Sequence, residues 1–136
     1  MGGMWLAENK NSYDVVYKYD NVYDVLGIKV NRDFQYGVTV EMDDGLLLDF
    51  DVDNVPEALE MHDASKRLNV SPESLDNIQF LKMNISVDAN SITINAIFGL
   101  LIKNIENECQ IHSITSNFTN IPEIEAELIL WFFKSY

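Results

Sequence analysis

A strict alternation of apolar and polar side chains is the feature that most constrains how this chain folds. Successive side chains of a β-strand point to opposite faces, so this spacing predicts strands with one buried and one solvated face. We expect residues 81–87 and 92–98 to form one hairpin. The apolar positions flank a break at residues 89–90 and are Leu81, Met83, Ile85 and Val87, then Ile92, Ile94, Ala96 and Phe98.

Strand signals also run through the first half of the chain. Residues 13–19 and 23–30 are rich in Val, Ile and Tyr, which favour strands, and turn-forming residues separate them. Residues 38–42 and 46–50 flank Asp43-Asp44-Gly45, where the Asp-Gly step provides the positive φ that a tight hairpin needs. Residues 58–61 then predict a return strand.

Two short helices are expected between these groups of strands. Residues 63–68 combine an acidic start with good helix formers. Ser71, Pro72 and Glu73 are typical of a helix N-terminus and predict a helix near residues 72–78. We therefore predict an α+β, predominantly β fold, in which antiparallel meanders pack as one compact unit with one or two short helices near residues 63–79.

The length of 136 residues favours a single domain over residues 1–136. Residues 69–74 mark a seam between an N-terminal meander (residues 12–62) and a C-terminal meander (residues 80–133). The last strand, residues 123–133, begins amphipathic and ends apolar on both sides. Two interpretations stay open: a central strand inside the fold, or a homodimer interface through Trp131 and Phe133.

The charge excludes some partners and favours others. Nine Lys and Arg against 22 Asp and Glu give a net charge of −13, which repels phosphate backbones, so no nucleic acid is expected as a partner. The same charge attracts a basic protein. A single cysteine, Cys109, suits a reducing compartment, and the apolar runs are too short to cross a bilayer. We expect a cytoplasmic protein without a membrane partner.

One acidic segment has the spacing of a calcium loop. Counted from its first residue, acids fall at the positions from which an EF-hand presents oxygens to Ca²⁺. The sixth position is Asn54 in place of glycine, and the flanks alternate like strands. The segment is therefore either a weak divalent-cation site or a solvated hairpin corner that binds no ion tightly. The five candidate ligands are Asp49, Asp51, Asp53, Glu57 and Glu60.

A series of acidic and aromatic residues runs through the first half of the chain: Tyr19-Asp20, Asp24, Asp49, Asp51, Glu60 and Ala64-Ser65. With these residues at similar spacing, the first half resembles a small prokaryotic family known as domain of unknown function 2283. The resemblance implies a compact β-meander with a short helix and no established chemistry. Genes of some members look like neighbours of genes for small toxin-like proteins, so the resemblance also implies antitoxin-like partner binding.

Three functions follow from these patterns. The first is a noncatalytic, acidic protein-binding domain whose partner is a basic protein or a second copy of itself; the resemblance implies that such a domain is antitoxin-like. This function needs no cofactor. The alternative is a weak divalent-cation module at residues 49–60, which would bind Ca²⁺ weakly. An enzyme ranks third, because His62 and His112 each lack a second histidine or cysteine at metal-ligand spacing and no serine has the motif of a nucleophile.

Overall fold

The computed structural model describes residues 11–131. Nine strands and two short helical segments follow one another along the chain. In order these are β1 (Asn11–Asp20), β2 (Val25–Val30), β3 (Tyr36–Asp43), β4 (Leu46–Asp51), β5 (Pro56–His62), α1 (Ala64–Leu68), the 3₁₀ helix η2 (Pro72–Asp76), β6 (Ile78–Val87), β7 (Ser91–Ile102), β8 (Ile105–Ser116) and β9 (Ile124–Trp131).

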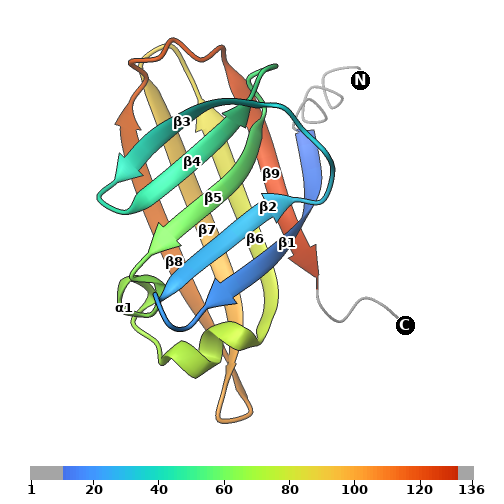
Figure 1. The fold of residues 1–136 in the computed structure, drawn as a ribbon, viewed down its shortest axis with the longest axis vertical. Helices are drawn as coiled ribbons and strands as arrows, with labels where there is room; N and C mark the ends of the chain where they lie inside the picture. The colour runs from blue at the N-terminus through green and yellow to red at the C-terminus, as the bar shows by residue number, and fades with distance from the viewer. Residues whose placement is uncertain (1–10, 132–136) are drawn as a thin grey trace, which may run out of the picture.

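The nine strands form one sheet in the order β3-β4-β5-β2-β1-β9-β6-β7-β8. The sheet curls, so that β1 to β5 form a front layer and β6 to β9 a back layer behind it (Figure 1). Neighbouring strands are antiparallel except β1 and β9, which run parallel over Asn11 to Asp14. From Val15 onward β1 pairs with β2 instead. The first strand therefore joins the two layers.

The core lies between the two layers and follows the alternation of the strands. The predicted hairpin of residues 81–87 and 92–98 is confirmed as β6 and β7, and that of residues 38–42 and 46–50 as β3 and β4. Every predicted inward position of β6 and β7 is at most 3% exposed. The front layer contributes its own fully buried side chains, namely Leu26, Leu46, Leu48, Phe50 and Met61.

The two edge strands of the sheet approach each other. The Ser113 hydroxyl on β8 donates a hydrogen bond to the Met42 carbonyl on β3 over 3.3 Å. This contact brings the edges of the front and back layers together on one side of the molecule. On the other side β1 makes the connection, so the core is enclosed on both sides.

The predicted α+β class is wrong, because residues 11–131 are 65% strand and only 8% helix. The first helical segment has five residues, and left-handed residues, Asp63 (φ 52°) and Asn69 (φ 58°), bound it on both sides. Forming the first turn of a helix is unfavourable, and this segment ends before further hydrogen bonds can compensate, so the helix is not stable by itself. Residues 72–76 form only a 3₁₀ turn, and the Ser71 hydroxyl contacts the Ser74 hydroxyl instead of capping a helix.

Residues 64–76, which form α1, η2 and the link between them, carry the chain from the front layer to the back layer. The predicted seam at residues 69–74 lies within this segment. Leu68 and Leu75 are buried and cover one end of the core. Over residues 11–131, neither helical segment is long enough to span a bilayer.

Candidate functional site

Strand alternation divides the acidic segment of residues 49–60 between two faces of the front layer. Asp49 on β4 and Glu60 on β5 point outward, whereas Glu57 on β5 points inward and is fully buried. Asp51 is also buried, at the end of β4, and Asp53 lies exposed in the turn that follows. The five candidate ligands do not converge. Among residues 11–131 no group of three or more acidic, histidine or cysteine side chains is arranged to hold a metal ion.

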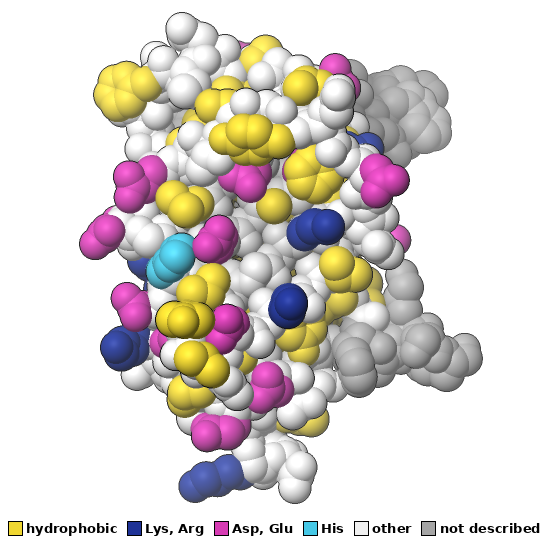
Figure 2. Space-filling view, in the orientation of Figure 1, with side chains coloured by type: hydrophobic (Ala, Val, Ile, Leu, Met, Phe, Trp, Pro, Cys, Tyr) yellow, Lys and Arg dark blue, Asp and Glu magenta, His cyan; other side chains and the backbone are white. Residues whose placement is uncertain are grey.

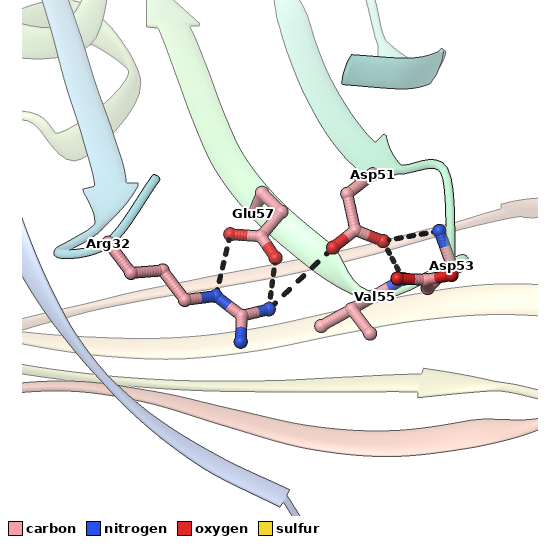
Figure 3. A network of polar contacts seen from close by, with 5 residues as sticks. All are labelled: Arg32, Asp51, Asp53, Val55 and Glu57. Atoms are coloured by element: carbon pink, nitrogen blue, oxygen red, sulfur yellow. Dashed lines mark hydrogen bonds and ion pairs between the residues drawn. The ribbon is translucent and has the colours of Figure 1, made fainter. Parts of the chain in front are cut away.

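The buried pair, Glu57 and Asp51, forms a polar cluster with Arg32, which follows the end of β2 (Figure 3). The Arg32 Nη2 contacts Glu57 Oε2 and lies 3.6 Å from Asp51 Oδ2. The other oxygen of Asp51 accepts hydrogen bonds from the backbone N–H groups of Asp53 and Val55, over 2.8 and 2.9 Å. These contacts tie together the ends of three strands.

The position of Glu57 has a local cause in the strand pairing. Asp49 pairs with Ala58 and Phe50 with Pro56, so Glu57 is the extra residue of a β-bulge. A bulge redirects the side chain that it contains. Here it directs the carboxylate toward Arg32, whose guanidinium lies 4.9 Å from the centre of the Tyr13 ring.

Burial and hydrogen bonding shift the two carboxyl groups in opposite directions. Burial raises the pKa of Glu57, and the nearby Asp51 carboxylate adds to this effect against the lowering influence of Arg32. Burial also disfavours the charged form of Asp51, but the backbone donors at Val55 and Asp53, with Glu57 and Arg32, outweigh it and lower the pKa of Asp51. The chain's own donors hold these carboxylates, so we interpret the cluster as a structural clamp.

The outward pair borders a hollow of about 660 Å³ on the outer face of the front layer. Its floor is low because Gly27 has no side chain and Ala58 has a small one. A Cβ placed at Gly27 would have its nearest neighbour 3.9 Å away, so the space above this glycine is open. Lys18, Tyr23, Asp49 and Glu60 are among the residues that line the hollow.

The strand register separates opposite charges across this hollow. In one row across the sheet, Lys18 pairs with Gly27 and Gly27 pairs with Glu60. In the next row, Lys29 pairs with Ala58 and Ala58 pairs with Asp49. In these two rows the lysines lie on the β1–β2 side and the acids on the β5–β4 side. Asp20 of β1 also lines the hollow, where its carboxylate accepts hydrogen bonds from the backbone N–H groups of Val22 and Tyr23. We call this surface the dipolar face and define it by Lys18, Lys29, Asp49 and Glu60 around Gly27 and Ala58.

Figure 2 shows the same separation on the front of the molecule. Near the centre of this face, basic side chains lie to the right, and acidic side chains with a histidine lie to the left. His62 Nε2 lies 3.0 Å from Glu60 Oε2, and Thr39 donates a 2.6 Å hydrogen bond to Asp49. In the part of the chain that the structure describes, neither Lys18 nor Lys29 forms an ion pair.

An aromatic pair covers part of the outer face of the back layer. The rings of Phe80 on β6 and Trp131 on β9 stack with centres 5.6 Å apart, and Phe80 lies over Gly99 of β7. Trp131, which the sequence predicts as an interface residue, is 45% exposed. Phe133, the second predicted interface residue, lies outside the described residues. The interface at these two positions stays a prediction.

Three residues that carry the family resemblance meet at the start of α1. The Asp24 carboxylate accepts hydrogen bonds from the backbone N–H and the hydroxyl of Ser65, over 3.0 and 2.8 Å, and from the Tyr19 hydroxyl over 2.7 Å. Burial works against the charged form of Asp24, but these three donors outweigh it and lower its pKa. Asp24 therefore anchors the short helix to the turn before β2.

Sequence reasoning did not identify Arg32, Lys18, Lys29 or Gly27 as members of a site. The lysines alternate with apolar residues in their strands, as solvated positions do, and only the pairing of β1, β2, β5 and β4 brings them opposite the acids. Comparisons of the chain with protein-family models, with curated proteins and with solved structures find no match. The resemblance to domain of unknown function 2283 therefore depends on the quoted residues alone.

Proposed function

We propose that this protein is a noncatalytic protein-binding domain and that the dipolar face is its binding surface. The observation that carries the proposal is the open hollow around Gly27, with two lysines free of ion pairs on one side and two acids on the other. Ionic groups that lack partners within the chain are available to charged groups of another molecule. Their separation defines what that molecule must present.

The spacing of these charges suits a protein surface. Neighbouring strands lie about 4.8 Å apart, so Lys18 and Glu60, two strands apart, have backbones about 10 Å from each other. Charges this far apart do not converge on one reacting atom, as catalysis requires. They match acidic and basic side chains that a partner carries on neighbouring strands or helical turns.

The net charge of −13 adds an effect at longer range. It raises the rate of encounter with partners that have basic regions, and salt screens it. We assign specificity to the dipolar face and the speed of association to the overall charge, because a fixed pattern of opposite charges sets orientation.

The test compares two variants with the same net charge. Asp49→Asn with Glu60→Gln removes the acidic side of the face, and Glu106→Gln with Glu108→Gln removes two exposed acids from β8. Each tagged protein captures partners from a lysate of the source organism at low and high salt, and mass spectrometry quantifies them. We expect the control to retain the wild-type partner and the face variant to lose it by about tenfold or more. Equal retention by both variants would contradict the proposal.

A further inference from the structure

We propose that the partner of the dipolar face is a second copy of this chain, packed face to face about a two-fold axis. The inference rests on the proposed function, because it names the occupant of the same surface. It follows from the order of the charges in the two rows. Each row carries a lysine at one end, a glycine or alanine in the middle and an acid at the other end.

A two-fold axis that runs along the strands between β2 and β5 reverses this order. A second face turned over about such an axis places its acidic side over the lysines of the first, and its lysines over the acids of the first. This axis places β5 of the partner subunit over β2 and β4 of the partner subunit over β1. Glu60 of the partner subunit then lies over Gly27, one strand from Lys18, and Asp49 of the partner subunit lies over Val16, one strand from Lys29. Symmetry repeats both contacts, since a two-fold interface uses the same patch on both subunits.

The low floor of the hollow makes this approach feasible. Sheets that stack face to face lie about 10 Å apart, which leaves room for long side chains only where the opposite surface is low. Gly27 and Ala58 provide that space in the middle of each row. The lysine side chains can therefore extend across the interface to the acids of the second copy.

The size of the face predicts a weak dimer. Five strands about 4.8 Å apart and about six residues long, at about 3.4 Å per residue, give a face of roughly 24 by 20 Å. Two such faces bury roughly 1,000 Å² in total, which is the lower end of the range for specific interfaces. The negative charge of each subunit further opposes association. We therefore expect a dissociation constant in the micromolar range or above, which sedimentation at several protein concentrations can measure.

Charge exchange tests the two-fold arrangement directly. Lys18→Glu places an acid beside Glu60 of the partner subunit, and Glu60→Lys places a lysine beside Lys18 of the partner subunit, so each variant alone dimerises at least tenfold more weakly than the wild type. An equimolar mixture of the two restores attraction at both contacts and forms a heterodimer. Lys103→Glu at the β7–β8 turn and Glu108→Lys on β8 carry the same charge changes away from the face and dimerise like the wild type.

Sedimentation velocity from about 10 µM to about 1 mM measures all six samples, and thermal melting confirms that each variant is folded. A wild-type protein that stays monomeric overturns the inference, as does a mixture that forms no heterodimer. The capture experiment separates this failure from that of the proposed function. If the wild type is monomeric but captures a partner that depends on Asp49 and Glu60, the dipolar face binds another protein and only the dimer is rejected. If the wild type is monomeric and the Asp49→Asn with Glu60→Gln variant captures the same proteins as the wild type, the dimer and the proposed function are both rejected.

Discussion

The buried and the exposed carboxylates of the same acidic segment differ in what surrounds them. Glu57 and Asp51 are buried, and Arg32 and backbone donors contact them. Asp49 and Glu60 lie on the outer surface with two lysines that form no ion pair among residues 11–131. Alternation separates Glu57 from Glu60 on β5, whereas Asp51 lies on the same side of β4 as Asp49 and is buried at the end of the strand. An acid therefore becomes structural or available for binding according to its immediate neighbours as well as the face of its strand.

The two outward-facing glycines show a similar contrast between filled and open space. Gly99 pairs with Phe80, whose ring covers it and stacks on Trp131. Gly27 lies between Lys18 and Glu60, and charged ends such as these extend into water. The side chain on the neighbouring strand therefore determines whether the space above a glycine is filled or open.

The largest expected effect is on stability, and it distinguishes the polar cluster of Arg32, Asp51 and Glu57 from the dipolar face. Arg32→Ala leaves the buried Glu57 without its cation, so we expect a loss of about 3 kcal/mol in the free energy of unfolding. Lys18→Ala removes an exposed charge without an ion pair, and we expect a change below about 0.5 kcal/mol. Urea denaturation measures both. Similar losses in the two variants would remove the distinction between clamp and binding face.

The glycines provide the next largest difference. A Cβ at Gly99 would overlap the Phe80 ring and force it out of the stack with Trp131, so Gly99→Ala is expected to cost about 1–3 kcal/mol. Gly27→Ala places its Cβ in open space and should stay within about 0.5 kcal/mol of the wild type. Thermal melting compares the pair. A stable Gly99→Ala variant would show that Phe80 moves aside without cost.

The dependence of stability on pH sharpens the description of the clamp. The folded protein raises the pKa of Glu57, so above about pH 4.3, the usual glutamate value, the unfolded chain ionises first and stability falls as pH rises, by at most about 1.4 kcal/mol per pH unit. Glu57→Gln should remove this fall. The lowered pKa of Asp51 has the opposite sign, since its contribution is lost as pH decreases through the folded value. Asp51→Asn should therefore reduce the loss of unfolding free energy at acidic pH. Chemical denaturation between pH 3 and pH 7 measures both variants, and unchanged curves would contradict these assignments.

Calcium is expected to have the smallest effect. Only Asp49 and Glu60 share the outer face, whereas Ca²⁺ takes six to eight oxygen ligands. We expect millimolar CaCl₂ to raise the melting temperature by about 1 °C or less. A larger rise that Asp49→Asn with Glu60→Gln removes would support the cation module and would mean that the segment rearranges around the ion.

The alternation of apolar residues was sufficient to predict most of the strands and both of the best-defined hairpins. It predicts the inward positions from Leu81 to Phe98 because the face on which a strand residue lies follows from the alternation of its immediate sequence neighbours. The helices failed for a physical reason, since residues such as Ala64 and Leu68 favour a helix but Asp63 and Asn69 end it after one turn.

The candidate site was less predictable than the fold. Spacing along the chain grouped five acids, but the alternation of β5 and the burial of Asp51 at the end of β4 divide them. The basic half of the dipolar face comes from strands that are 20 to 42 residues away in sequence, and no local pattern connects Lys18 or Lys29 to Asp49. Strand order is a property of the whole sheet, and it is the information that the sequence pattern lacks.

The parallel pairing of β1 with β9 has a consequence for how the protein is made. Asn11 pairs with Ala126, so β1 leaves the ribosome well before β9, the strand with which it pairs. Until then each layer has an uncovered strand edge, on β1 and on β6, at which nascent chains can join one another. Protection of this interval by a chaperone would therefore matter more for the yield of folded protein than the strength of any single contact within it.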